Sequence, residues 1–123
     1  MLAIRESQVE VFAEEQIRKL EDRATGHIRH SVPSDFSRLG EEQVRQSVRK
    51  AISKADRYGL ELEIDVIGYL NLMYVLGFDF DDDRRYPWAA EILEDQRYLG
   101  SAKIQLLNHR CRREFQREAE ARA

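Results

Sequence analysis

Four carboxylates within five residues make the segment Asp79–Asp83 the first place to look for chemistry. Carboxylates at positions 1, 3 and 5 begin the calcium-binding loop of an EF-hand. The rest of that loop does not follow, because position 6 is Arg84 instead of glycine and position 12 is Ala90 instead of a bidentate glutamate. Acidic residues ahead of a helix are stabilised by its N-terminal dipole without any metal. We therefore predict an acidic loop and no calcium site.

The three histidines and the single cysteine do not suggest a metal site either. His27 and His30 lie three residues apart and share a helix face, but a catalytic zinc site needs at least a third protein ligand. His109 and Cys111 lie two residues apart, which points them to different faces of a helix. We predict no bound metal and no cofactor.

Sequence signatures of catalysis are also missing, since the chain has no glycine-rich phosphate loop, nucleophile elbow or HExxH motif. Glu61 and Asp65 could pair for acid–base work, but such pairs arise freely in a chain with 35% charged residues. We interpret this pair as solvated helix surface. We predict that the protein is not an enzyme.

The last part of the chain is rich in arginine, with Arg110, Arg112, Arg113 and Arg117. These residues raise nucleic acid as a partner, but domains that bind nucleic acid typically have a pI above about 9. Here the sequence pI is near 5.7. The arginines alternate with glutamates, which favours ion pairs at three- and four-residue spacing along a helix. We predict no nucleic-acid partner.

Tyr86, Pro87 and Trp88 form a compact aromatic block. Tyrosine and tryptophan bury much area with few rotatable bonds, so they suit interfaces and protein cores alike. Trp88 is the only tryptophan in the chain. Core packing is our preferred interpretation of Trp88, and contact with a partner is the alternative.

The elements that position these residues are predicted to be helices. Ser7 and Glu10 have the spacing of a capping box, which predicts a helix start. After it, apolar residues recur at three- and four-residue steps up to Ile28, which predicts a helix to about residue 30. Pro33 disfavours further helix, so residues 34–40 are predicted to form a connector.

Two further helices are predicted in the middle of the chain. The first covers residues 41–58 and ends at Gly59, which takes the left-handed conformation common after helices. The next covers residues 61–76 and is apolar on more than one side, which is typical of a central, buried helix. The pattern apolar–glycine–apolar recurs at Gly77 and predicts the same kind of stop.

The C-terminal third is predicted to add a short helix that begins at Pro87 and a last helix after Gly100. The last helix has a narrow apolar stripe of Ile104, Leu107, Cys111 and Phe115. We predict an all-α protein, a single domain over residues 1–123, built as a bundle of four to five mostly antiparallel helices. The stripe suits an internal contact or the seam of a homodimer equally well.

The composition limits the class of protein. With 42% hydrophobic and 35% charged residues, the chain is too apolar for a disordered protein and too charged for a membrane protein. No apolar run approaches the roughly 20 residues needed to cross a bilayer, and no secretory signal is readable. One cysteine cannot form an intramolecular disulfide. We expect a cytoplasmic protein with no membrane partner.

Four stretches of the middle region share their pattern with known sequences: residues 55–60 (ADRYGL), 65–73 (DVIGYLNLM), 76–81 (LGFDFD) and 87–93 (PWAAEIL). They resemble a family of small helical bacterial proteins encoded beside the effector, spike and adaptor genes of type VI secretion systems. The resemblance covers about residues 50–95, with weaker agreement in the first helix. It implies an accessory protein that helps an effector or its adaptor to fold, stay soluble or load onto the spike. It implies no catalytic residue.

We therefore expect a non-catalytic, chaperone-like accessory factor that binds a secreted effector or its adaptor. The residues predicted to contact the partner are Asp79, Asp81, Asp82, Asp83, Arg84, Arg85, Tyr86, Trp88, Arg110, Arg113 and Arg117. An immunity protein, whose acidic middle region would block a basic toxin cleft, is the first alternative. A small nucleic-acid-binding regulator and a small enzyme are the remaining alternatives.

Overall fold

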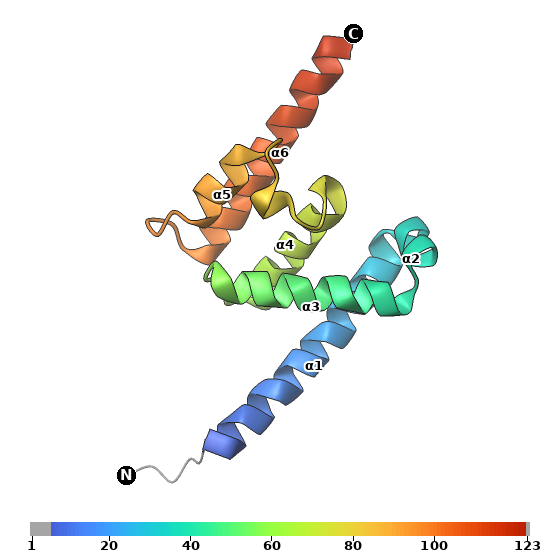
Figure 1. Cartoon of the computed structure of the whole chain (residues 1–123), viewed down its shortest axis with the longest axis vertical. Helices are drawn as coiled ribbons and strands as arrows, with labels where there is room; N and C mark the ends of the chain where they lie inside the picture. Colours follow the sequence, from blue (N-terminus) through green and yellow to red (C-terminus); the bar gives the residue numbers. More distant parts are fainter. Residues whose placement is uncertain (1–5, 123) are drawn as a thin grey trace. The chain divides into compact units, whose positions relative to one another are not determined.

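The described residues of the chain form helices and no strand in a computed structural model (Figure 1). The structure describes the backbone of residues 6–122 and the side chains of residues 14–122, so the predicted capping box at Ser7 and Glu10 lies outside the described side chains. The elements are α1 (Glu6–Ser31), α2 (Pro33–Leu39), α3 (Glu41–Arg57), α4 (Glu63–Leu76), the 3-10 helix η1 (Phe80–Asp82), α5 (Pro87–Leu93) and α6 (Gly100–Arg122). The predicted all-α class is confirmed.

The contacts among residues divide the chain into two compact units. The first unit extends to Arg49 and the second begins at Lys50, so α3 contributes to both. Each unit has buried residues and ion pairs of its own.

Residues 33–39 form the short helix α2, where the sequence predicts a connector. Pro33 occupies the first turn of α2, where its missing N–H costs no hydrogen bond, so the proline begins a helix instead of preventing one. All residues of α2 are described and none is buried, so this helix has no core-facing stripe for sequence periodicity to reveal. With α2, the described part of the chain has six α-helices instead of the predicted four to five.

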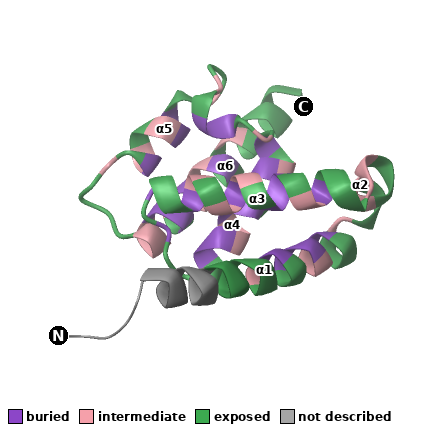
Figure 2. Ribbon diagram, turned by 60° about the horizontal axis from the view of Figure 1, so that its bottom comes forward, coloured by how far each residue is buried: buried purple, intermediate pink, exposed green. Residues whose placement is uncertain are grey.

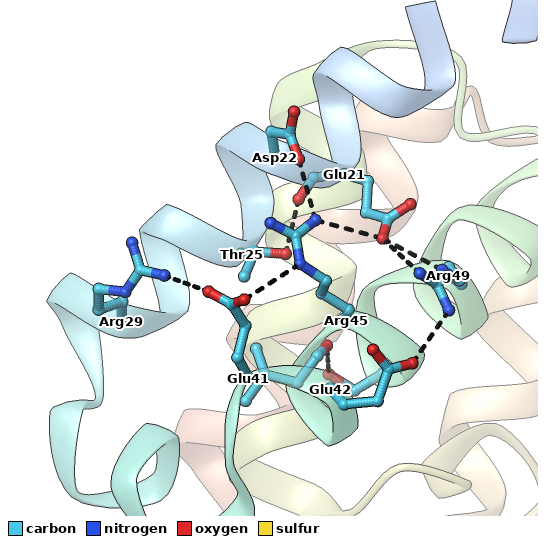
Figure 3. Close-up of polar contacts among 10 residues, drawn as sticks. Glu21, Asp22, Thr25, Arg29, Glu41, Glu42, Arg45 and Arg49 are labelled. Carbon is cyan, nitrogen blue, oxygen red and sulfur yellow. Dashed lines mark hydrogen bonds and ion pairs between the residues drawn. The ribbon is translucent and has the colours of Figure 1, made fainter. Parts of the chain in front are cut away.

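In the first unit an ionic network joins α1 to the beginning of α3 (Figure 3). The guanidinium of Arg45 lies 3.4 Å from the carboxylate of Glu21 and 2.9 Å from that of Asp22, and Arg49 lies 3.0 Å from the same Glu21 carboxylate. Glu21 is buried, Arg45 is half-buried and Arg49 is exposed. The shared acceptor ties these two arginines of α3 to one position on α1. The buried apolar residues of this unit include Ala24, Ile28, Val44 and Val48.

The end of α3, in the second unit, confirms the predicted stop at Gly59. Gly59 has a φ of +75°, and its N–H donates to the carbonyl of Asp56 at 3.3 Å. The N–H of Leu60 donates to the carbonyl of Ala55 at 2.8 Å, which completes a Schellman motif. Gly77, after α4, also has a positive φ, +124°, but its N–H donates to the carbonyl of Met73 in a simpler, one-bond stop.

Among the described elements of the second unit, α4 has the most buried residues, as its all-round apolar pattern predicts (Figure 2). Its buried residues are Asp65, Val66, Tyr69, Leu70, Leu72, Met73 and Leu76. α4 packs against α6, and a Cβ added to Gly68 would lie 2.8 Å from Cγ2 of Ile104. A side chain at this position would force Ile104 or the helices to shift.

The segment η1 and helix α5 pack against each other, and α5 also packs against α6. Phe80 of η1 is fully buried, and its ring lies 4.9 Å from the ring of Tyr69. In the apolar stripe of α6, Ile104, Leu107 and Cys111 are buried, whereas Phe115 is exposed. The stripe therefore serves mainly as an internal contact.

Candidate functional site

The acidic segment, residues 79–83, is attached to α3 by its most buried carboxylate. Oδ2 of Asp81 accepts hydrogen bonds from Nζ of Lys54 and from the hydroxyl of Tyr58, both at 2.7 Å. Burial raises the pKa of Asp81, but the bonds from Lys54 and Tyr58 outweigh it and bring the pKa below its ordinary value. Asp81 is only 4% exposed. The prediction that its side chain faces a partner is thus corrected, because Asp81 anchors η1 to α3.

Other charges of this region are also paired within the chain. Asp79 accepts a hydrogen bond from Lys50, and the carboxylate of Asp83 lies 2.8 Å from the guanidinium of Arg85. The bonds from Arg85 lower the pKa of Asp83. Asp79 and Arg85 stay exposed. Within residues 14–122, no three His, Cys, Asp or Glu side chains come together as a set that could hold a metal ion.

Two polar atoms beside this anchor are buried without a hydrogen-bond partner among the described residues. They are the hydroxyl of Tyr69 and Oδ1 of Asp81. Burial, followed by the nearby charge of Asp81, raises the pKa of Tyr69 far above its ordinary value. The rings of Tyr58 and Tyr69 are neighbours, with centroids 6.3 Å apart. The hydroxyl of Tyr58 is hydrogen-bonded to Asp81, whereas that of Tyr69 has no partner among the described residues.

The aromatic block divides between core and surface. Trp88 is 6% exposed and packs edge-on against Tyr86, with ring centroids 5.7 Å apart. The preferred interpretation of Trp88 as a core residue is confirmed, and its predicted role as a contact residue is corrected, because α5 turns the indole inward. Tyr86 remains half-exposed.

The arginines of α6 differ in their surroundings. Arg110 is half-buried, lies over the ring of Trp88 at 5.9 Å and donates to Glu114 at 3.0 Å, which is the predicted helical ion pairing. Arg113 and Arg117 are exposed. Their predicted contact with a partner stays a prediction, as does that of Asp79, Asp82, Asp83, Arg84, Arg85, Tyr86 and Arg110.

A surface that the sequence did not indicate lies where α3 turns into α4 and where the chain enters α6. A hollow of about 450 Å³ is lined by residues 58–65 and 96–103 in part. A second hollow of about 370 Å³ lies between α4 and α6 and shares Asp65 and Ser101 with the first. We call the two together the α4–α6 groove.

Large apolar side chains stand exposed around this groove. Leu62 is 57% exposed, Ile64 74%, Tyr98 38% and Leu99 83%. Leu62, Tyr98 and Leu99 line the first hollow, and Ile64 lines the second. Exposed apolar residues are ordinary when scattered, but a group of them around a concave surface is typical of a protein-binding site.

The floor of the groove holds a buried acid and a buried base. The hydroxyl of Ser101 donates to Asp65 Oδ2 at 2.7 Å, and Nζ of Lys103 donates to the carbonyl of Tyr58 at 2.8 Å. Asp65 is 5% exposed and Lys103 is 7% exposed. The interpretation of Asp65 as solvated surface is therefore corrected, because α4 turns it toward the first residues of α6. Glu61 is exposed, as predicted.

Close backbone packing holds the walls of the groove in place. A Cβ added to Gly100 would lie 2.8 Å from the carbonyl oxygen of Gly59 and 3.2 Å from Cα of Leu60. The start of α6 therefore rests directly on the turn that ends α3. The ammonium of Lys103 also stabilises the C-terminal end of α3, where carbonyl groups lack helical partners.

One signal in the sequence could have revealed this groove. The helix predicted for residues 61–76 has more apolar residues than one buried face accommodates, and Leu62 and Ile64 are the surplus at its beginning. Leu99 lies just before Gly100, between the short helix predicted to begin at Pro87 and the predicted last helix.

Comparison with protein-family models, with curated proteins and with solved structures finds no match to this chain. The resemblance to type VI secretion accessory proteins therefore stays a prediction. Across the part of the chain that the structure describes, no helix has both the length and the apolar composition required to cross a membrane.

Proposed function

We propose that this protein is a non-catalytic, chaperone-like accessory factor that binds another protein in the cytoplasm through the α4–α6 groove. The observation that supports the proposal is the group of exposed apolar side chains, Leu62, Ile64, Tyr98 and Leu99, around a concave surface. The polar groups of the floor are engaged with one another, since Ser101 bonds to Asp65 and Lys103 to the carbonyl of Tyr58. Such an arrangement suits binding of an apolar surface.

The apolar area exposed around the groove limits the affinity of the complex that it can form. Fully burying one large apolar side chain contributes roughly 1.5–3 kcal/mol, so covering four of them contributes at most about 6–12 kcal/mol. Association costs an estimated 4–15 kcal/mol, so the groove alone supports a weak complex. A tight complex requires further contacts. Exposed charged residues predicted from the sequence, such as Arg84, Arg85, Arg113 and Arg117, remain candidates for them.

We propose further that the partner is a type VI secretion effector or its adaptor, and that the protein helps it to fold or to load onto the spike. This part rests on the resemblance of residues 55–93, a range that includes the end of α3 and the whole of α4. The resemblance concerns proteins encoded beside effector and adaptor genes, so the products of the neighbouring genes are the first partners to test.

The test is co-purification of the tagged protein with each product of the neighbouring genes. The double variant Leu62→Ser/Leu99→Ser should lose the partner, because it removes apolar area from the rim. Val75→Ser is the matched control, since Val75 is 55% exposed on α4 and does not line the groove. Equal retention by the double variant and the control would overturn the role of the groove. Failure of the unmodified protein to retain any of these products would overturn the proposed function.

Co-expression also separates an accessory role from neutralisation of a toxin. An accessory factor raises the soluble yield or the export of the effector, whereas an immunity protein must keep toxin-producing cells alive. Survival without any gain in yield or export would overturn the accessory role in favour of immunity.

A further inference from the structure

The sequence Asp-x-Arg-Tyr occurs twice in the second unit, at residues 83–86 and 95–98, and both copies form the same hydrogen-bonded turn. In each copy the backbone N–H of the arginine donates to Oδ1 of the aspartate, at 2.9 Å in the first copy and 3.0 Å in the second. The guanidinium also donates to both carboxylate oxygens, with a shortest bond of 2.8 Å in the first and 2.7 Å in the second. It lies over the ring of the tyrosine that follows, 5.2 Å and 5.7 Å from the centroid. We call these segments the Asp83 turn and the Asp95 turn.

The two turns differ in what lies beside them. The Asp83 turn leads into α5, and its tyrosine, Tyr86, packs against the ring of Trp88. None of residues 83–86, all of them described, lines either hollow of the α4–α6 groove. The Asp95 turn leads toward α6, and its Tyr98 lines the first hollow together with the adjacent Leu99. The same local structure therefore occurs once at the groove and once away from it.

Hydrogen bonds, more than packing, hold the Asp95 turn in place. Gln96, Arg97, Tyr98 and Leu99 in the loop between α5 and α6 are all exposed (Figure 1). An exposed segment with few packing contacts opens easily unless other bonds order it. The bonds between Asp95 and Arg97 join two charged groups, which makes them stronger than bonds between neutral groups. They lower the pKa of Asp95 to about 2, so its carboxylate stays ionised near neutral pH.

Order in this loop bears on affinity. A side chain that is mobile before association loses its freedom when the partner covers it, and that loss opposes binding. A side chain already held in its bound position loses less, so the same apolar contact gives a higher affinity. Leu99 is 83% exposed and thus makes few contacts of its own that could hold it.

We propose that the Asp95 turn holds Tyr98 and Leu99 in the positions in which they contact a partner at the α4–α6 groove. Asp95 and Arg97 are then positioning residues that act through these two side chains. This inference rests on the proposed function, because the partner is the one that the groove binds.

The first measurement is the order of the loop in the full-length protein, from nitrogen-15 relaxation of backbone amides. The order parameter of Leu99 should be near the value of rigid backbone, about 0.85, and should fall below about 0.6 in Asp95→Ala. Asp83→Ala is the matched control, since it breaks the same bonds away from the groove and should leave Leu99 unchanged. An unchanged order parameter of Leu99 in Asp95→Ala would overturn the inference.

The second measurement is affinity for the neighbouring-gene product that the unmodified protein retains, determined by isothermal titration calorimetry. Asp95→Ala should weaken binding about tenfold, because Tyr98 and Leu99 must then be ordered on association. Asp83→Ala should weaken it less than twofold. The midpoint of urea unfolding should be unchanged in both variants, because ion pairs this exposed add little stability. Equal losses of affinity in the two variants would overturn the inference.

Arg97→Lys separates positioning from direct contact by a charge. Lysine keeps the positive charge of Arg97 but cannot form the two parallel bonds to the carboxylate or stack on a ring in the same way. It should therefore weaken binding as Asp95→Ala does. If Arg97 instead contacted the partner through its charge, Arg97→Lys would bind normally, and Asp95→Ala, which leaves Arg97 free, would not weaken binding. That pair of results would overturn the inference.

Two further outcomes distinguish this inference from the proposed function. If Asp95→Ala loosens Leu99 but binds the retained product normally, the groove does not need an ordered rim. The inference is then overturned, and the proposed function stands. If the unmodified protein retains none of the neighbouring products, the proposed function fails, and the inference that rests on it fails too, whatever the order parameters are.

Discussion

The acidic segment at residues 79–83 and the α4–α6 groove lie in the same unit of the chain. They differ in which side chains are paired or buried and which are exposed. In the acidic segment, Asp81 is buried and bonded to Lys54 and Tyr58, and Asp79 and Asp83 are paired with Lys50 and Arg85. Around the groove, four large apolar side chains are exposed while the polar groups of the floor are bonded internally. Charge concentrated in a sequence can thus serve the fold, while the exposed apolar residues around the groove are the basis of the proposed binding site.

This contrast leads to an ordered set of expectations. Variants of the acidic anchor should lower stability strongly, because they leave a buried carboxylate without its partners. Variants of the exposed rim of the groove should leave stability almost unchanged and affect only binding.

The largest effect is expected for Lys54→Met. The side chain of Asp81 is 1% exposed, and removing its cationic partner should lower the free energy of unfolding by about 3 kcal/mol. Urea denaturation followed by circular dichroism measures the change. A loss below about 1 kcal/mol, the range of an exposed pair, would contradict the anchoring role of Asp81.

Gly100→Ala should come next, with a loss of about 1–3 kcal/mol, because its Cβ would meet backbone atoms of Gly59 and Leu60 that cannot move aside easily. Gly26→Ala is the matched control: nothing lies within 4 Å of a Cβ at this helical position, so stability should rise by about 0.5–1 kcal/mol. Thermal denaturation of both variants gives the comparison. Stabilisation by Gly100→Ala would disprove the close contact at the wall of the groove.

The two neighbouring tyrosines should respond differently to loss of the hydroxyl. Tyr58→Phe removes a hydrogen bond to a buried carboxylate and should cost about 1.5 kcal/mol. Tyr69→Phe removes a buried hydroxyl that has no partner among the described residues, so it should be neutral or slightly stabilising. Equal melting temperatures of the two variants would be inconsistent with a hydrogen bond to Asp81 from Tyr58 and none from Tyr69.

Acid should lower the free energy of unfolding, because folding lowers the pKa of some carboxylates. The ordinary pKa of an aspartate is about 3.9, whereas Asp81 is shifted below it and the bonds from Arg97 lower the pKa of Asp95 to about 2. The unfolded chain therefore binds more protons as the pH falls below about 4, and stability is lost from there toward about pH 2. In Lys54→Met the pKa of Asp81 should rise, so the melting temperature should depend less steeply on pH. Parallel curves for the two proteins would assign the acid response to other carboxylates.

The smallest effect is expected at the rim of the groove. Leu62→Ser/Leu99→Ser should lower the free energy of unfolding by no more than about 0.5 kcal/mol, because both side chains are exposed and serine is a favourable N-cap residue at position 62 of α4. The same urea titration measures it. A loss above about 1.5 kcal/mol would mean that the rim is packed within the chain, and the contrast between the two regions would fail.

Sequence patterns predicted the helices that depend on local chemistry. The glycine stop at Gly59, the proline start of α5 and the all-round apolar pattern of α4 each involve residues within a few turns, and the structure agrees with all three. The short helix α2 escaped prediction because none of its residues, all of them described, is buried, so it has no periodic apolar face.

The sequence by itself determined the all-α class and most helix limits, because caps, turns and periodicity act between residues that are close along the chain. Only the tertiary structure decided that Asp81 and Asp65 are buried, since their partners Lys54 and Ser101 lie 27 and 36 residues away. It alone decided that Leu62 and Leu99 stand beside one hollow, because that depends on how the turn after α3 meets the start of α6. Whether a side chain is buried depends on all of its neighbours in space, and few of those neighbours are close to it along the chain.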